Sequence, residues 1–298
     1  MLYGVAAYLL WGLFPLYWPL LEPAGAEEIL AHRVVWSLLT MLVLVTASRR
    51  LPQLRAIFRQ HRVRNLLTLA AVVVAVNWGT YIWGVNHHRV VETSLGYFIN
   101  PLVSVLLGVV VFSERLRPLQ WAAVAIAAVA VLVLTVDYGR PPWIALSLAA
   151  TFGFYGLMKK LVKVEAAPGL FVETTLVAVP ALVTLAVLHA HGSGTFFSHG
   201  PSHALLLASA GIATAVPLLL FAAAARRVPL STVGLLQYLT PIMQLLIGVF
   251  VYGEPMPAGR LVGFAIVWLA LVVFTVDSLR HARDSNRRPI AEPVPAGL

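Results

Sequence analysis

Ionisable side chains inside long apolar stretches are the residues of this 298-residue sequence that could do chemistry. The most distinctive group is His32, Arg33 and Trp36, which follows Glu28 in an otherwise apolar segment. Ionisable groups are costly at membrane depth, so they mark candidate substrate or gating sites. Arginine keeps its proton, and Glu28 lies five positions from Arg33, outside i,i+4 pairing. We expect a partner on another helix; the alternative is an interfacial arginine that snorkels to the headgroups.

A second polar stripe lies in NWGTYIWGVNHH at 77–88. Spacings of four, three and four place its members on one face of a helix, and these members are Asn77, Tyr81, Gly84 and His88. Trp78 and Trp83 flank this face. Aromatic walls with a few orienting polar groups suit a cavity for amphipathic organic molecules. An aromatic belt with interhelical hydrogen bonds is the alternative.

The run His87, His88, Arg89 and Glu92 does not predict a metal site. Neighbouring positions on a helix point about 100° apart, and no HExxH motif is present. Glu92 has two interpretations: a protonatable coupling carboxylate, or a carboxylate stabilised by the dipole at a helix N-terminus.

Two prolines interrupt apolar spans. Pro101 and Pro241 each remove a helix hydrogen bond and are expected to kink their helices, as hinges or as packing features. The polar residues beside them are candidates for a cavity wall: Tyr97, Asn100, Gln237 and Tyr238. Tyr155 and Glu173 complete the set, and Glu173 is expected to correspond to the Glu28 region in the other half of the chain.

The composition requires a membrane. The chain is 60% hydrophobic and 11% charged, with a mean hydropathy of +0.86, too little polar surface for a soluble domain. Apolar runs of about 20 residues, each long enough to cross a bilayer, predict ten helical spans. They are 2–21, 29–47, 66–86, 92–112, 119–136, 143–161, 169–188, 204–224, 230–252 and 259–278. The first run is read as a retained helix rather than a signal peptide. Without cysteine, no thiolate chemistry is available.

Charge placement predicts the topology. Of the 21 Lys and Arg residues, 17 fall in the connections after even-numbered spans or in the C-terminal segment. The positive-inside rule therefore places both termini in the cytoplasm. The arginines between spans 2 and 3 are expected to face anionic lipid headgroups rather than nucleic acid.

The chain contains an internal repeat. Residues 97–137 align without a gap on 237–277 with 13 identities in 41 positions, including Pro101/Pro241, Glu114/Glu254 and Asp137/Asp277. Five spans per unit is an odd number, so the second unit enters the membrane from the opposite side, as in many secondary transporters. We predict repeats at 2–137 and 141–278, followed by a basic, disordered cytoplasmic tail at 279–298. The GxxxG at Gly259–Gly263 and the alanines Ala123 and Ala127 predict close helix packing, and they would also suit a homodimer face.

No motif predicts an enzyme. The sequence lacks a P-loop, a GxSxG motif and paired aspartates for a metal, and it implies no cofactor. Energy for transport would come from an ion gradient, with protons as the first candidate, or from exchange.

Several blocks resemble a known family. They are AYLLWGLFPLYW at 7–18, EILAHRVVWS at 28–37, NWGTYIWGVNHH at 77–88, ETSLGYFINPLVSVLLG at 92–108, FGFYGLMKK at 152–160, VETTLVAVP at 172–180, PLSTVGLLQYLTP at 229–241 and YGE at 252–254. The chain resembles the RarD-type branch of the EamA-domain drug/metabolite transporter superfamily. The resemblance implies an all-α bacterial inner-membrane protein of ten helices in two inverted repeats, and a permease of the chloramphenicol-sensitivity type. Pro19 departs from the lysine common in the family, and Glu254-Pro255 differs from Glu114-Arg115.

Together these observations predict an alternating-access exporter of small organic solutes, with a cavity between spans 1–4 and 6–9. Arg33 is expected to recognise an anion or carbonyl, and Asn77, Tyr81 and Tyr97 to orient the solute. A membrane scaffold or regulatory subunit without transport is the main alternative, and it predicts a dry interior. An embedded enzyme is the third.

Overall fold

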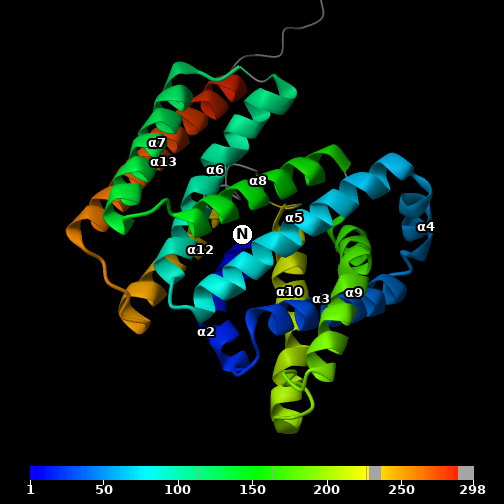
Figure 1. Cartoon of the computed structure of the whole chain (residues 1–298). Helices are drawn as coiled ribbons and strands as arrows, with labels where there is room; N and C mark the ends of the chain where they lie inside the picture. Colours follow the sequence, from blue (N-terminus) through cyan, green and yellow to red (C-terminus); the bar gives the residue numbers. More distant parts are fainter. Residues whose placement is uncertain (114, 163, 226, 228–235, 288–298) are drawn as a thin grey trace, which may run out of the picture.

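The computed structural model describes every residue except 114, 163, 226, 228–235 and 288–298, and the described chain is helical without strands (Figure 1). In chain order the elements are α1 (Leu2–Gly12), α2 (Phe14–Tyr17), the 3₁₀ helix η1 (Trp18–Leu21), α3 (Ala26–Ala47), α4 (Leu51–Arg59), α5 (His61–Asn86), α6 (Val90–Phe112), α7 (Pro118–Tyr138), α8 (Trp143–Val162), α9 (Ala166–Ala190), α10 (Gly200–Ala225), α12 (Leu239–Leu246), the π-helix η2 (Ile247–Val251) and α13 (Ala258–Arg287). Glu114 of the predicted Glu114/Glu254 pair lies outside the described residues.

The first predicted span is broken. The segments Leu2–Gly12 and Phe14–Leu21 meet at a bend of 44°. Pro15 lies in the first turn of α2 and Pro19 in the first turn of η1. Proline fits a first turn but cannot continue the hydrogen bonding of a preceding helix, so the chain changes direction at these positions.

Within the described residues, seven helices are long and apolar enough to cross a membrane, or eight if the bent pair forms one span. The chain is therefore a polytopic α-helical membrane protein. The other two predicted spans correspond to α8, whose last turn carries Lys159 and Lys160, and to the shorter apolar segment Leu239–Val251. The predicted tail is partly wrong: α13 continues to Arg287, because residues 279–287 contain neither Pro nor Gly to end it.

Helices far apart in sequence pack together. α7 lies along α13, α3 packs on both α9 and α10, α6 on α8 and α12, α5 on α8 and α9, and α1 on α10 and α12 (Figure 1). Two pairs of helix starts share an offset of 140 residues: Ala26 and Ala166 open α3 and α9, and Pro118 and Ala258 open α7 and α13. Every part of the interior therefore joins the first half of the chain to the second.

Small residues permit the closest approaches. A side chain at Gly211 of α10 would collide with the backbone of Trp36 in α3, so glycine is required where these helices cross. Gly259 faces Asp137 and Gly263 faces Leu134, and Ala123 is buried in the same apolar cluster. The small-residue motifs therefore form an α7–α13 contact within one chain.

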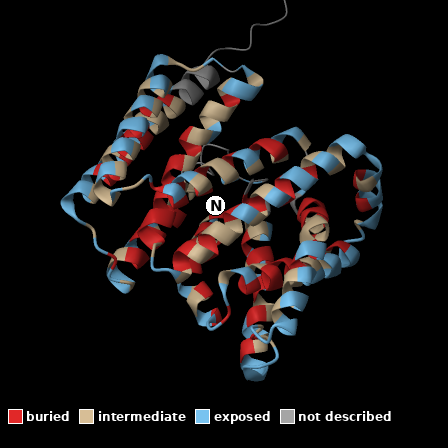
Figure 2. Cartoon of the chain, viewed as in Figure 1, coloured by how far each residue is buried: buried red, intermediate tan, exposed pale blue. Residues whose placement is uncertain are grey.

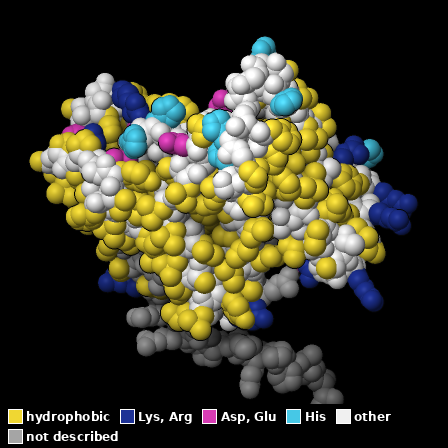
Figure 3. Space-filling model, turned by 90° about the horizontal axis from the view of Figure 1, so that it is seen from below, with side chains coloured by type: hydrophobic (Ala, Val, Ile, Leu, Met, Phe, Trp, Pro, Cys, Tyr) yellow, Lys and Arg dark blue, Asp and Glu magenta, His cyan; other side chains and the backbone are white. Residues whose placement is uncertain are grey.

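The outer surface is that of a membrane protein. Figure 2 shows buried residues where the central helices meet and exposed residues on the outer sides of α7, α13 and α4. Hydrophobic side chains cover most of the face in Figure 3, with His, Asp and Glu gathered towards the upper edge and Lys and Arg projecting at the right and lower edges. This distribution fits an apolar belt between two polar rims.

Candidate functional site

Arg33 is the central residue of the candidate site. It lies on α3, about 10 Å from the start of the helix at 1.5 Å per residue, and is 4% exposed. Its Nε donates to Thr214 Oγ1 of α10 at 2.9 Å. The sequence predicted that Arg33 has a partner on another helix. That partner is the hydroxyl of Thr214, on a helix from the second half of the chain.

Aromatic rings surround the guanidinium of Arg33. Its Cζ lies 3.9 Å from the ring centroid of Trp78 on α5, 4.9 Å from that of Trp18 on η1 and 5.8 Å from that of Phe14 on α2. The π faces attract a cation without neutralising it. Among the described residues, no carboxylate lies within 4 Å of Arg33, and its two terminal nitrogens have no hydrogen-bond acceptor. These N–H groups can serve a ligand.

Other buried polar atoms near Arg33 also lack partners. Without a hydrogen-bond partner among the described residues are His32 Nδ1 and Nε2, Trp36 Nε1, Ser37 Oγ and Trp18 Nε1. Buried polar groups are normally paired. Four of these five atoms lie on α3, so a polar ligand that reached Arg33 would find further groups to bind there.

The α5 stripe serves helix contacts. Asn77 Nδ2 donates to Leu148 O at 3.1 Å and to Thr151 Oγ1 at 2.9 Å, both on α8. The hydroxyl of Tyr81 accepts from Gln244 Nε2 of α12 at 2.9 Å. Both α5 residues are buried. These contacts match the interhelical alternative for the stripe, whereas Trp78 reaches the Arg33 site.

The other predicted wall residues are dispersed. Tyr97 makes edge contacts with Tyr81 and Phe152, and Asn100 Oδ1 is buried without a partner among the described residues. Gln237 and Tyr238 precede α12, and Tyr238 packs on the α6–α7–α13 cluster. Among the described residues, none of the four forms a hydrogen bond with Arg33, whose hydrogen-bond partner is Thr214.

The prolines occupy different settings. Pro101 lies in the middle of α6. Pro241 lies in the first turn of α12, which begins at Leu239, a position where its missing N–H is not needed. Residues 228–235, which make up most of the predicted span before Pro241, lie outside the described residues, so the kink at Pro241 stays a prediction.

The carboxylate of Glu28 has several polar partners near the start of α3. Glu28 accepts hydrogen bonds from the backbone N of Thr195 at 2.7 Å, Thr195 Oγ1 at 3.0 Å and the N of Phe196 at 3.3 Å. Thr195 Oγ1 also contacts His203 Nε2 at 2.8 Å. His32 Nε2 lies 3.9 Å from Glu28, and its ring stacks on Phe196 at 4.6 Å.

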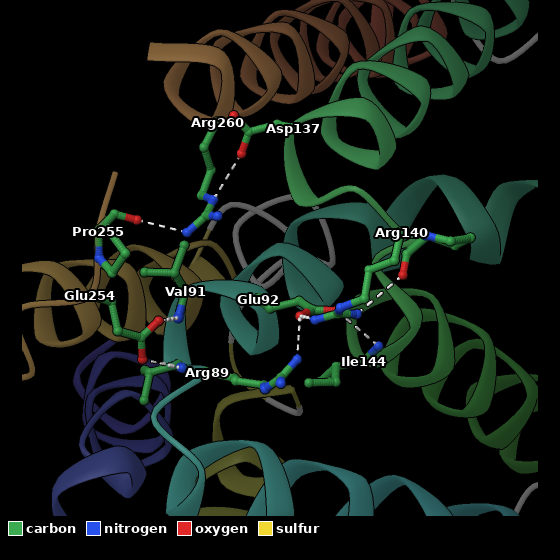
Figure 4. A network of polar contacts seen from close by, with 11 residues as sticks. Arg89, Val91, Glu92, Asp137, Arg140, Ile144, Glu254, Pro255 and Arg260 are labelled. Atoms are coloured by element: carbon green, nitrogen blue, oxygen red, sulfur yellow. Dashed lines mark hydrogen bonds and ion pairs between the residues drawn. The ribbon is translucent and has the colours of Figure 1, made fainter. Parts of the chain in front are cut away.

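Glu92 joins two helix N-termini. Figure 4 shows its carboxylate facing Arg140, Arg89 and the backbone of Ile144. Arg140 Nη2 donates at 2.7 Å and Ile144 N, in the first turn of α8, at 3.2 Å. This geometry favours the interpretation of Glu92 as a carboxylate held at helix N-termini.

Glu254 caps α6 from the second half of the chain. Its carboxylate accepts from the backbone N of Val90 and, at 2.9 Å, from that of Val91 (Figure 4). Burial raises the pKa of Glu254, although these two amides act to lower it. The repeated glutamate thus has a structural partner at a helix N-terminus.

The repeated aspartates form reciprocal ion pairs. Asp137 at the end of α7 receives Arg260 Nε from the start of α13 at 3.2 Å (Figure 4). Asp277 of α13 receives Arg117 Nε from the residue before α7 at 2.7 Å. The two helices are therefore antiparallel and tied at both ends.

Glu173 on α9 has a closed environment. Its Oε1 lies 2.6 Å from Lys159 Nζ, and its Oε2 accepts the Tyr155 hydroxyl at 3.1 Å, both from α8. Trp78 and Glu173 border the same narrow gap between α5 and α9. Tyr155 thus supports Glu173 and does not reach Arg33.

Several of these partners were not predicted. Thr195 and His203 lie in or beside a His-, Gly- and Ser-rich connection, and this composition predicted only a turn. Lys159 entered the sequence analysis only as one of the basic residues that predict the membrane topology. Thr214 and Gln244 are single polar residues in apolar helices, which is the signal that could have identified them.

Comparisons with known proteins agree with the sequence blocks. The model of the EamA-like transporter family matches residues 1–136 and again 141–276. Protein RarD of Streptomyces exfoliatus is 54% identical over 288 residues, covering 97% of this chain and 91% of that protein. Protein RarD of Escherichia coli is 42% identical over 288 residues, covering 96% of this chain and 97% of that protein.

A more distant relative is the Chloramphenicol-sensitive protein RarD of Pseudomonas aeruginosa, 35% identical over 297 residues and covering 97% of each chain. A solved crystal structure of 18% sequence identity superposes with a TM-score of 0.60, covering 92% of this chain and 96% of that one. At this identity the likeness concerns the fold alone.

Proposed function

Because the chain belongs to the EamA-like transporter family, we propose that it exports small organic solutes across the bacterial inner membrane by alternating access, with Arg33 as the residue that recognises an anionic or carbonyl group. The observation that carries this proposal is the buried guanidinium of Arg33. Its terminal N–H groups are unpaired among the described residues, and Trp78 and Trp18 lie against it. A guanidinium offers paired donors to planar anions, and the rings suit an apolar or aromatic body.

Two inverted five-helix repeats would place this site between the halves. Three observations support this architecture: the two family matches, the 140-residue offset shared by two pairs of helix starts, and the reciprocal Asp–Arg pairs. Arg33 comes from the first half and Thr214 from the second. In such transporters the substrate site lies near the midplane between the repeats, which rock around it. A five-helix repeat then requires that α8 and the segment Leu239–Val251 also cross the membrane. The chain would have ten membrane spans, with both termini in the cytoplasm.

Proton coupling is assigned to Glu28 in this proposal. Its carboxylate has three N–H or O–H donors and lies 3.9 Å from His32. Among the described residues it has no Lys or Arg within 4 Å, unlike Glu92 and Glu173. Such a carboxylate can gain a proton without breaking an ion pair with a permanent cation.

Transport in proteoliposomes tests the role of Arg33. Radiolabelled chloramphenicol, chosen from the name of a relative, and a bacterial metabolite extract would be loaded on one side, and efflux followed with and without a pH gradient. We expect Arg33→Ala to reduce transport of the solute by about 100-fold and Arg33→Lys to restore part of it. Arg115→Ala, which removes an exposed arginine, is the matched control. Unchanged transport by Arg33→Ala would rule out the assignment.

One observation favours the scaffold alternative. Asn77 and Tyr81 are buried and hydrogen-bonded to α8 and α12, as a dry interior would require. Asn77→Ala discriminates between the two functions. If the protein is a transporter that separates α5 from α8 during its cycle, loss of the Asn77 hydrogen bonds changes the rate of transport. A scaffold shows no solute flux with or without the substitution.

A further inference from the structure

α4 is a short helix between two membrane spans, and it carries both buried apolar residues and exposed arginines. It joins α3 to α5 at the right-hand edge of Figure 1. One face is buried, with Leu54 and Ile57 in an apolar cluster with Val45, Leu67 and Val172. These contacts come from α3, α5 and α9, so α4 rests on both halves of the chain.

A groove runs along α4 beside this buried face. A groove of about 440 Å³ is lined by Leu51, Leu54, Arg55, Phe58 and Arg59. Arg55 and Arg59 are four positions apart and therefore share one side of the helix. The groove thus combines two cations with the apolar surface of Leu51 and Phe58.

The arginines of this groove lack acidic partners. Residues 49–64 contain six arginines and no acidic residue. Arg50 pairs with Glu165, and Arg64 contacts His61. Among the described residues, neither Arg55 nor Arg59 has a carboxylate within 4 Å. The right-hand edge of Figure 3, on the side where α4 lies in Figure 1, carries a projecting cluster of Lys and Arg side chains.

The position of α4 fits a headgroup. The candidate spans Ala26–Ala47 and His61–Asn86 end and begin on either side of it, so α4 lies where hydrocarbon gives way to polar groups. Val162, the last residue of α8, and Val164, just after it, pack on the same cluster. We propose that the α4 groove binds one anionic phospholipid of the cytoplasmic leaflet, with the phosphate between Arg55 and Arg59 and an acyl chain along Leu51 and Phe58.

Native mass spectrometry of the full-length protein tests this site. The protein would be titrated with dioleoyl phosphatidylglycerol and, as the zwitterionic counterpart with equal chains, dioleoyl phosphatidylethanolamine. We expect the first phosphatidylglycerol to bind about 10-fold more tightly, and Arg55→Gln/Arg59→Gln to abolish this preference. Arg55→Lys/Arg59→Lys should keep most of it, because lysine also binds phosphate. Circular dichroism checks that both variants retain their helices.

The control removes two charges elsewhere. Arg115 and Arg280 are exposed and lie on the same predicted side, so Arg115→Gln/Arg280→Gln should leave the preference unchanged. An equal loss in this control would overturn the site in favour of general charge attraction. Competition by free glycerol 3-phosphate would overturn the lipid as the occupant. Binding of a single-stranded oligonucleotide that is lost in Arg55→Gln/Arg59→Gln would overturn it in favour of nucleic acid.

Discussion

Arg33 and Glu173 occupy equivalent places in the two halves but differ in how their charges are balanced. The 140-residue offset that aligns the repeats places Arg33 of α3 opposite Glu173 of α9, and these two helices pack on each other. At the 140-residue offset of the two family matches, Glu173 aligns with Arg33, five positions after Glu28. Glu173 has a lysine at 2.6 Å and a tyrosine hydroxyl at 3.1 Å. Arg33 has one threonine hydroxyl and three aromatic rings.

The difference is that one charge has a partner of opposite sign within the protein, whereas the other is assigned to a ligand under the proposed function. A buried ion pair satisfies both partners, so removing one leaves an uncompensated charge. A buried cation without a carboxylate gains little stability from its surroundings, and the proposed function accounts for its presence by assigning it to a ligand. Trp78 contacts the Arg33 guanidinium and also borders the gap beside Glu173. Movement of α5 against α9 would therefore affect both positions together.

The largest effect is expected at the closed site. Lys159→Met should lower the free energy of unfolding by about 3 kcal/mol, because it leaves the Glu173 carboxylate buried without its cation. Glu173 is 1% exposed, so water cannot replace the lysine. Unfolding in mixed micelles, followed by circular dichroism, measures this change.

The matched control for Lys159→Met removes both charges. Lys159→Met/Glu173→Leu should recover most of the lost stability, because no buried charge remains. If the double variant is no more stable than the single one, the ion pair is not the source of the effect, and the contrast with Arg33 loses its basis.

A smaller change in stability is expected at the open site. Arg33→Met should alter the free energy of unfolding by less than about 1 kcal/mol, because relief from burying a charge offsets the lost cation–π contacts. Transport should nevertheless be lost. Thermal unfolding and proteoliposome efflux on the same preparation measure both. A destabilisation as large as that of Lys159→Met would show that Arg33 is a structural cation and contradict its role in binding.

The sequence predicted helix positions well because apolar runs dominate them. The expected span 29–47 lies within α3, and 119–136 lies within α7. The break after Gly12 and the extension of α13 were missed, because they depend on local proline placement and on a helix that continues beyond the apolar run. Hydropathy reports burial in lipid and is silent on such ends.

The candidate site was predictable only in part. The sequence singled out both Arg33, as a charged residue in an apolar segment, and Trp78, as an aromatic residue beside a polar stripe. Their contact could not be predicted, because it depends on how α3 crosses α5. Asn77 was expected beside them and instead faces α8. A stripe on a helix gives relative directions within that helix, whereas the neighbour it faces is a property of the packed bundle.

The two ends of the α7–α13 pair offer the smallest and sharpest comparison. Both Asp137–Arg260 and Asp277–Arg117 are ion pairs, but the Arg260 side chain is 14% exposed and that of Arg117 is 35% exposed. Asp137→Asn should therefore destabilise by about 1 kcal/mol and Asp277→Asn by about 0.5 kcal/mol or less after solvent screening. Adding salt should reduce the second effect more than the first.

Thermal unfolding of each variant at low and high salt measures these two effects. Equal effects with equal salt dependence would mean that the two ends are equivalent in energy as well as in sequence, so that exposure does not distinguish paired charges in this protein.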